Sequence, residues 1–179
     1  RLGFKRATNK TSKPTYDIGL KDPINKTSVD WVRAGKVTKV KDQGDCGSCW
    51  AFSTIGGIES AFAIDSGKLV SLSEQELVSS DSESRCKECG CMGCQGGNMD
   101  YAVEYAMKNP ICAESAFEYV SGTGLVPKCA SKCKGFVEVG RNNDVPKGDE
   151  AALLKAVSSR PVIVAIEADK QVFHLYKSG

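Results

Sequence analysis

The chain has 179 residues, of which 41% are apolar, so it is long enough to bury a packed core. Its 24 basic and 22 acidic side chains leave a formal charge of +2, which gives no signal for binding to nucleic acid or to a membrane surface. No apolar run approaches the roughly 18 residues that a membrane-spanning helix needs.

The nine cysteines are many for this length and odd in number. One reactive thiol plus as many as four disulfides fits this count, and such a density is typical of an oxidising compartment. Reduced, buried thiols are the alternative interpretation.

The N-terminal third predicts an extension, a short strand and one long helix. Residues 1–27 are polar, lysine-rich and without helical period, so we expect a flexible extension. Residues 36–40 alternate polar and apolar side chains, which predicts a strand. A helix is expected from Cys49 to about Gly67, and Gly56-Gly57 inside it indicates close packing against another element. Its apolar side chains recur at helical spacing: Trp50, Phe52, Ile55, Ile58, Phe62 and Ala63.

Shorter elements follow along the chain. Ser73 and Glu76 form a capping box that opens a short helix through Val78, and residues 79–88 read as a polar loop. Asn98 or a neighbour caps the next helix, which ends before Asn109-Pro110. Its expected apolar face comprises Met99, Ala102, Val103 and Ala106.

The C-terminal part predicts one helix and one strand. Residues 149–158 are expected to be helical, and residues 162–167 form an apolar run that predicts a strand buried on both faces. The side chains that should point inward from the helix are Ala152, Leu153, Ala156 and Val157.

The chemistry is concentrated in residues 43–52, Gln-Gly-Asp-Cys-Gly-Ser-Cys-Trp-Ala-Phe. Cys49 stands where a polar loop becomes a helix, and the unpaired N–H groups and dipole of a helix N-terminus favour the nucleophilic thiolate. The side-chain amide of Gln43 and the backbone N–H of Cys49 are candidate donors to an oxyanion. A nucleophile with two such donors indicates acyl transfer and still requires a base. Trp50 is expected to be a packing residue beside the site.

This segment resembles the active-site segment of the papain-like cysteine proteases of the cathepsin L-like branch, whose catalytic cysteine is the second of the motif. Further segments resemble the family in its own order: residues 28–31, 72–78, 93–100 and 161–166. The resemblance implies an α+β fold of two lobes, one helical and one an antiparallel β-barrel. It implies that residues 1–24 are the tail of a propeptide. Residues 25–179 would then be the peptidase domain, with the barrel lobe incomplete and the catalytic His and Asn beyond Gly179.

The function implied is that of a cysteine endopeptidase made as a zymogen, which acts through a thioester acyl-enzyme and needs no cofactor or metal. Cys49 would be the nucleophile and Gln43 an oxyanion donor. The expected partners are peptide or protein substrates, the chain's own propeptide and cystatin-type inhibitors, and the expected state is a monomer in a lysosome or vacuole or outside the cell. The substrate-binding residues implied are Gly47, Trp50, Gly96, Gly97, Met99 and Ala165, and the last two predict a preference for a bulky apolar residue two positions before the scissile bond.

The cysteines of residues 86–94, at positions 86, 89, 91 and 94, have a spacing that also suits a tetrahedral zinc or iron–sulfur site. The family pattern instead pairs Cys94 with Cys46. Family members usually carry a cysteine where this chain has Ser79-Ser80, so the second bridge is expected to move to Cys86. The candidate distant partners of Cys86, Cys89 and Cys91 are Cys112, Cys129 and Cys133. We expect Cys86 and Cys129 to be disulfide-bonded, and the connectivity of these six cysteines stays open.

The base is the missing part. His174 is the chain's one histidine, and it lies in Phe-His-Leu-Tyr, which resembles a family element that precedes the catalytic histidine. We therefore interpret His174 as a structural or solvent-facing residue and expect negligible turnover from these residues alone. Two other functions stay open: a catalytically dead homologue that binds peptides or inhibitors, and a cysteine-rich metal-binding module.

Overall fold

A computed structural model describes residues 28–80, 92–127 and 133–177. Within these ranges the elements are α1 (Cys49–Ser66), α2 (Glu74–Ser80), η1 (Gly93–Gln95), α3 (Met99–Lys108), η2 (Glu114–Ala116), η3 (Ser121–Thr123), α4 (Glu150–Ser159) and α5 (Gln171–His174). Pairing between backbone strands is limited there to two isolated antiparallel bridges, Leu72 with Ala113 and Ile111 with Val137. None of the helices in these ranges combines the length and apolarity that a membrane crossing requires.

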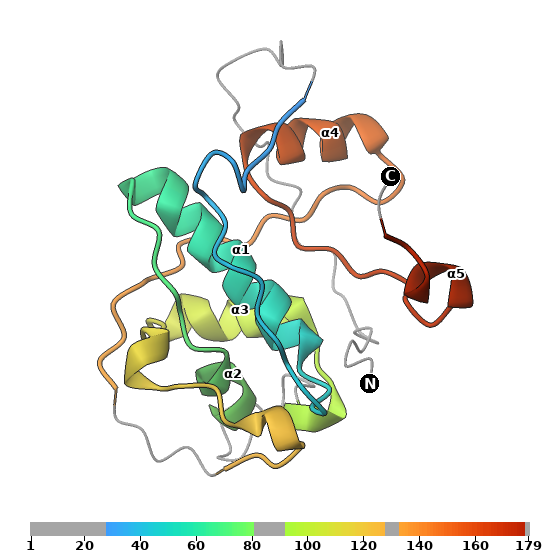
Figure 1. Cartoon of the computed structure of the whole chain (residues 1–179). Helices are drawn as coiled ribbons and strands as arrows, with labels where there is room; N and C mark the ends of the chain where they lie inside the picture. The colour runs from blue at the N-terminus through green and yellow to red at the C-terminus, as the bar shows by residue number, and fades with distance from the viewer. Residues whose placement is uncertain (1–27, 81–91, 128–132, 178–179) are drawn as a thin grey trace.

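Helix α1 is the central helix, and α2 and α3 pack against it (Figure 1). It begins at Cys49 and ends as expected, because Gly67 adopts the left-handed conformation (φ 75°) that closes a helix at low cost. The buried core is formed by side chains of the three helices and of the bridged segments: Trp50, Ile55, Ile58, Leu72, Leu77, Val78, Ala102, Ala106, Ile111 and Val137.

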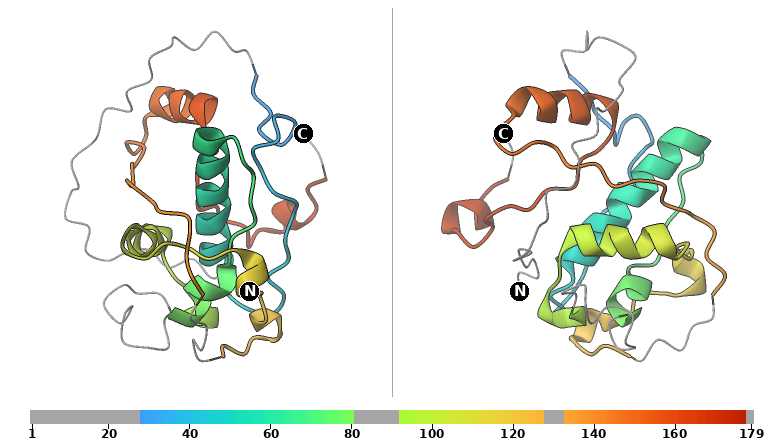
Figure 2. Two further views of the ribbon diagram at one scale, coloured as in Figure 1. Left: turned by 90° about the vertical axis from the view of Figure 1, so that its left-hand side faces the viewer. Right: turned by 180° about the vertical axis from the view of Figure 1, so that it is seen from behind.

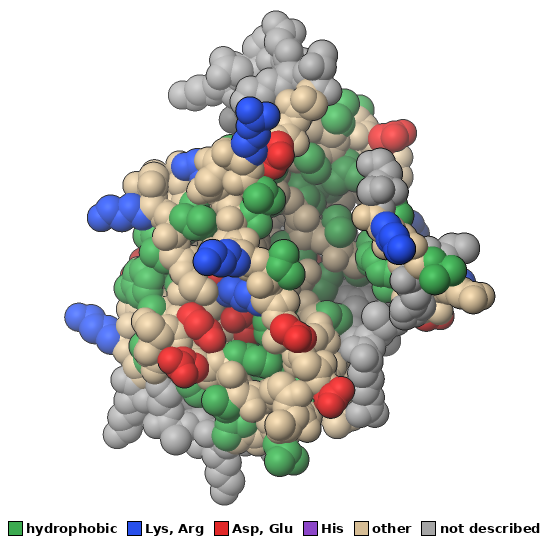
Figure 3. Space-filling view, viewed as in Figure 1, with side chains coloured by type: hydrophobic (Ala, Val, Ile, Leu, Met, Phe, Trp, Pro, Cys, Tyr) green, Lys and Arg blue, Asp and Glu red, His purple; other side chains and the backbone are tan. Residues whose placement is uncertain are grey.

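Helices α4 and α5 lie outside this core. Figure 2 shows α4 near the C-terminal half of α1 and α5 apart from the other helices. The indole N–H of Trp31 donates to the carbonyl of Val157 (2.8 Å), which ties the start of the described chain to α4. A groove of about 1310 Å³ separates α1 from α4, and Figure 3 shows apolar side chains in the hollow on this face. Its lining includes Gly57, Phe62, Met99, Val137, Leu153 and Ile163.

The predicted strand at residues 36–40 is wrong. The segment is irregular and Val40 is fully exposed. Its polar side chains bind to α1 instead, since Lys36 Nζ donates to the Ala63 carbonyl (2.7 Å) and Thr38 Oγ1 donates to Glu59 (2.6 Å). The alternation of side chains therefore reflects one face that contacts a helix, not a ladder of backbone hydrogen bonds.

The predicted strand at residues 162–167 is also wrong as a buried strand. The segment is irregular, and Val164 and Ile166 are 55% and 60% exposed. A doubly buried strand needs neighbouring strands and covering elements, and the described residues pair no strand with it. The half-buried side chain of Ile163 fills the space over Gly57, so the close packing predicted for Gly56-Gly57 is confirmed at Gly57. It is wrong at Gly56, where a Cβ would meet no atom within 4 Å.

The other helices follow the predictions with local differences. Helix α3 is capped by Asn98, whose side-chain oxygen accepts from the Asp100 N–H (2.8 Å). Helix α2 begins after Ser73, whose Oγ accepts from the Glu76 N–H (3.0 Å), but the Glu76 carboxylate accepts from the Cys112 N–H (2.8 Å) instead of closing the capping box. Helix α2 also continues past Val78 to Ser80. In α4 only Ala156 is fully buried, so the inward position predicted for Leu153, which is 38% exposed, is wrong.

Candidate active site

Cys49 is the first residue of α1, and Ser48 is the N-cap. Its thiol belongs to neither disulfide of the described chain and is partly exposed. The first backbone N–H groups of an α-helix have no partners within the helix, and the helix dipole is positive at this end. The sulfur therefore lies where negative charge is favoured and where a reactant can approach.

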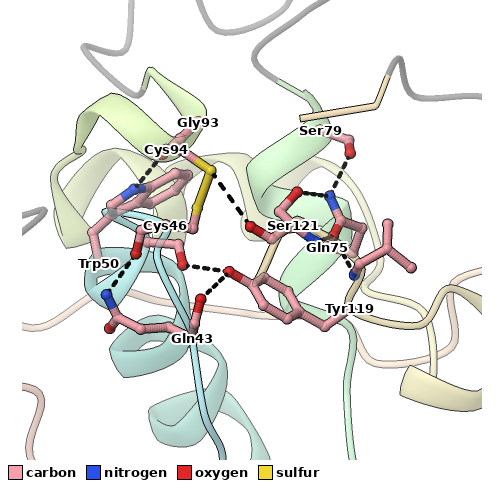
Figure 4. The surroundings of a disulfide bond; sticks show 11 residues. Gln43, Cys46, Trp50, Gln75, Ser79, Gly93, Cys94, Tyr119 and Ser121 are labelled. Atoms are coloured by element: carbon pink, nitrogen blue, oxygen red, sulfur yellow. Dashed lines mark hydrogen bonds between the residues drawn. A yellow bond between two sulfur atoms is a disulfide. The ribbon is translucent and has the colours of Figure 1, made fainter. Parts of the chain in front are cut away.

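The loop before α1 is held by a disulfide between Cys46 and Cys94, the pair that the resemblance implies. The Gly47 N–H donates to the Cys94 carbonyl (3.0 Å). The Trp50 indole N–H donates to the Gly93 carbonyl (3.2 Å), as Figure 4 shows. One disulfide and two hydrogen bonds thus join residues 46–50 to the short helix η1. Because Cys94 is used in this disulfide, it is not a ligand of the metal site that we considered at residues 86–94, and the other three cysteines of that site lie outside the described residues.

Gln43 precedes Cys46 in the loop before α1, and Cys49 follows it. Its side-chain N–H₂ donates to the Cys46 carbonyl (2.6 Å), as Figure 4 shows. An amide nitrogen carries two hydrogens, so this bond fixes the side chain and uses one of them. The arrangement suits an amide that keeps its second N–H for an oxyanion.

Gly96 and Gly97 are both buried, and each requires glycine for its own reason. Gly96 has φ 110°, a conformation that L side chains rarely adopt. A Cβ on Gly97 would lie 2.5 Å from Cδ2 of Trp50, so the indole occupies the space that a side chain would need. Both glycines are expected above to bind substrate, and the structure adds a conformational and a packing reason for them. Trp50 itself is 1% exposed and supports this segment from within the core.

Met99 and Ala165 are in different surroundings. Met99, the first residue of α3, is half-buried and lines the groove between α1 and α4. Ala165 is exposed in the irregular segment that follows α4, next to Val164, which lines the same groove. The structure thus places Met99 in the lining of the groove and Ala165 next to a lining residue.

The second disulfide of the described chain joins Cys112 to Cys133. This corrects the expectation that Cys112 and Cys133 pair with cysteines of residues 86–91. Cys86 and Cys129, which are also expected to be disulfide-bonded, lie outside the described residues. A Glu76 oxygen and the sulfurs of Cys112 and Cys133 lie within 4.8 Å of one another, but sulfurs joined in a disulfide are not thiolate ligands for a metal. The two disulfides indicate that the chain folds in an oxidising compartment.

Tyr119 is the residue of this site that the sequence did not reveal. Its hydroxyl donates to the Gln43 carbonyl (2.9 Å) and is hydrogen-bonded to the Ser48 hydroxyl (2.9 Å). Its ring packs edge-on against Phe52 of α1, with ring centroids 4.9 Å apart. A single tyrosine in a stretch without helical or strand period carries no local signal, and only the fold shows that it reaches residues more than 70 positions earlier.

A buried charge cluster lies where the loop before α1 meets α1 and α2. Lys41 Nζ donates to Glu59 (2.7 Å) and to Glu74 (2.5 Å). Both carboxylates are almost fully buried, and burial raises the pKa of Glu74 to about 7 although the bond to Lys41 opposes the shift. The cluster therefore changes its charge near neutral pH.

His174 ends α5, and its side chain is outside the described part of the structure. We assign no catalytic base to the described residues. What the site holds is a cysteine at a helix N-terminus, the side-chain amide of Gln43 bonded to the Cys46 carbonyl, and two glycine-containing segments joined by a disulfide.

These features place a partly exposed thiol at a helix N-terminus, and comparison with known proteins gives the family of the chain. The family model described as papain family cysteine protease matches residues 25–179. The chain belongs to the papain family of cysteine proteases.

Individual relatives and solved structures support this family assignment. The chain is 46% identical over 154 residues to the thiol protease SEN102 of Hemerocallis sp., an alignment that covers 85% of this chain and 40% of that protein. It is 47% identical over 156 residues to the KDEL-tailed cysteine endopeptidase CEP2 of Arabidopsis thaliana, an alignment that covers 86% of this chain and 41% of that protein. The chain thus spans about 40% of the length of these curated relatives.

Among solved structures, the Carica candamarcensis cysteine protease CMS1MS2 in complex with E-64 matches with a TM-score of 0.75 and 35% identity, covering 86% of this chain and 68% of that one. Digestive procathepsin L 3 of Tenebrio molitor matches with a TM-score of 0.69 and 38% identity, and the match covers 81% of this chain and 44% of that one. The fold is therefore the papain-like α+β fold, and the described part is mostly helical, with few β-bridges.

Proposed function

We propose that the full protein is a cysteine endopeptidase in which Cys49 is the nucleophile. The observation that carries the proposal is the position of the Cys49 thiol at the N-terminus of α1, partly exposed and next to the loop that the Cys46–Cys94 disulfide holds. The family membership of the chain supports the same chemistry.

In the proposed reaction the Cys49 thiolate adds to the carbonyl carbon of a peptide bond. The carbonyl oxygen becomes an oxyanion that accepts from the backbone N–H of Cys49 and from the side-chain N–H₂ of Gln43. Collapse of this intermediate expels the amine, which takes a proton from the base, and leaves a thioester on Cys49. Water then hydrolyses the thioester, so no cofactor or metal enters the reaction.

The base and the group that orients it are proposed to lie in a part of the protein outside these 179 residues. His174 is the one histidine in the sequence, and its Phe-His-Leu-Tyr context differs from that expected of the base. We likewise propose that residues 1–24 belong to a propeptide, so that the protein is made as a zymogen. Two of the similar solved structures, a procathepsin L and a pollen protease, are described as precursor or proform enzymes.

The proposed substrates are peptides with a bulky apolar residue two positions before the scissile bond. Met99 at the groove and the apolar side chains around it support this preference. The proposed partners are the propeptide and cystatin-type inhibitors, and the proposed state is a monomer in a lysosome or vacuole or outside the cell. Backbone at Gly47, Gly96 and Gly97 is the proposed contact surface for an extended peptide.

The test is hydrolysis of fluorogenic peptides by the full-length natural protein after maturation. We expect turnover of a peptide with Phe or Leu two positions before the bond, and we expect Cys49→Ser to lower kcat by at least about a thousandfold. Gln43→Ala should lower kcat by about a hundredfold, because one oxyanion donor is lost. Gln171→Ala, at an exposed position, is the matched control and should have no effect. Unchanged turnover in Cys49→Ser would refute the proposal.

A further inference from the structure

The two proposed oxyanion donors belong to segments that must be held at a fixed separation. Gln43 precedes the disulfide cysteine Cys46, whereas the Cys49 N–H belongs to the first turn of α1. An oxyanion is stabilised only when both donors point at one place, so a bond between the two segments has a direct effect on the chemistry.

Tyr119 provides this bond. A phenol has one hydrogen, and a carbonyl can only accept, so the bond of the Tyr119 hydroxyl to the Gln43 carbonyl uses that hydrogen. The bond between Tyr119 and Ser48 must then have Ser48 as donor. The result is a chain of two hydrogen bonds that runs from Ser48, the residue before Cys49, through Tyr119 to Gln43.

The position of Tyr119 is itself fixed from three sides. Its backbone N–H donates to Glu114 (2.8 Å), and its ring packs against Phe52. The fully buried side chain of Gln75 accepts from the backbone N–H groups of Val120 (2.8 Å) and Ser121 (3.0 Å). Figure 4 shows Gln75 and Tyr119 arranged in this way beside the disulfide. Tyr119 is therefore an anchored group and not a mobile surface tyrosine.

A second contact between the same segments is made by backbone. The Asp45 N–H donates to the Gly122 carbonyl (2.8 Å), and Gly44 lies so close to Gly122 that a Cβ on it would be 2.4 Å from that carbonyl oxygen. The loop from Gln43 to Ser48 is thus bonded to residues 119–122 at several points along its length. Burial raises the pKa of Tyr119, which keeps the phenol protonated and able to donate.

We propose that Tyr119 is a positioning residue of the active site, which sets the separation of the two oxyanion donors through its bonds to Gln43 and Ser48. This inference rests on the proposed function. It assigns to Tyr119 an effect on capture of the tetrahedral state and none on the intrinsic reactivity of the Cys49 thiol.

Two probes on the full-length protein separate these effects. A peptide aldehyde reacts reversibly: the Cys49 sulfur bonds to the aldehyde carbon, the C=O π electrons move to oxygen, and that oxygen takes a proton or is held as an oxyanion. Iodoacetamide alkylates the thiol by displacement of iodide and creates no oxyanion. Alkylation is followed on the peptide that contains Cys49 by mass spectrometry, so the other cysteines do not interfere.

We expect Tyr119→Phe to weaken aldehyde binding by about tenfold and to leave the rate of alkylation within about twofold of the wild type. Tyr105→Phe is the matched control, because it removes a hydroxyl that contacts Glu76 (3.5 Å) in another part of the core, and it should change neither probe. Equal aldehyde affinity in Tyr119→Phe and wild type overturns the inference, as does an equal loss in both probes.

If Tyr119→Phe does not fold, Ser48→Ala takes its place, because it removes the first bond of the chain and keeps the tyrosine. We expect about a threefold loss of aldehyde affinity, and no loss overturns the inference. A wild-type protein that is alkylated at Cys49 but does not capture the aldehyde refutes the inference. A wild-type protein that reacts with neither probe refutes the proposed function itself.

Discussion

At the scale of single residues, the contact between Gly97 and Trp50 leaves no room for a side chain at position 97. The indole is 1% exposed, its N–H is bonded to the Gly93 carbonyl, and its ring atoms lie where a Gly97 side chain would be. A well-packed core has no room into which an indole can move without cost. The segment that follows Cys94 is thereby held against the first turn of α1, next to Cys49.

We therefore expect Gly97→Ala to lower the free energy of unfolding by about 1–3 kcal/mol, the usual cost of overpacking. Unfolding in urea, monitored by tryptophan fluorescence, measures this change. Gly140→Ala is the control, since a Cβ there meets no atom within 4 Å, and it should change stability by less than about 0.5 kcal/mol. An equal effect of the two substitutions would show that the indole does not restrict position 97.

At the scale of elements, α1 is attached to the loop before it and to α2 by charges as well as by apolar packing. Lys41 lies between Glu59 of α1 and Glu74 of α2, and Glu59 also accepts from the Leu72 N–H (2.8 Å) and from Thr38 (2.6 Å). One cation thus faces two buried carboxylates, with Glu114 acting on Glu74 as a further negative charge. An excess of buried carboxylate favours the protonated form of one of them.

This cluster predicts a pH dependence of stability. The pKa of Glu74 is raised by burial from 4.5 to about 7, so the folded chain binds a proton more tightly than the unfolded chain between these values. The stability from protonated Glu74 is fully present below pH 4.5 and is lost as the pH rises through about 7. Glu74→Gln should flatten this fall, which we expect to be on the order of 2 kcal/mol between pH 5 and pH 8.

The measurement is urea unfolding of both proteins from pH 5 to pH 8, compared by the slope of the unfolding free energy. Glu150→Gln, at an exposed position in the first turn of α4, serves as the control and should keep the wild-type slope. Parallel slopes for wild type and Glu74→Gln would mean that Glu74 does not titrate in this range.

At the scale of the whole molecule, local patterns and long-range contacts were predicted with different success. Helices α1 and α3 were predicted with their ends, because caps such as Asn98 and Gly67 and a 3.6-residue period are local signals. The strands that were predicted at residues 36–40 and 162–167 do not form, since a strand depends on partners that are distant in sequence.

The same contrast holds at the site. Cys49 and Gln43 lie in one ten-residue motif and are recognisable from it. Tyr119, Gln75 and the buried Lys41–Glu59–Glu74 cluster come from separate segments that only folding brings together. A sequence shows such a residue's type and not its neighbours, so its role becomes visible only in the structure.

The most direct test of the central claim is covalent labelling of Cys49 by a peptidyl epoxide in the full-length protein. The thiolate opens the epoxide ring through a C–S bond, and the ring oxygen takes a proton. We predict one label per molecule, located on Cys49 by peptide mapping, and none in Cys49→Ser. A label on another cysteine with Cys49 unmodified, or no label at all, would contradict the assignment of Cys49 as the nucleophile.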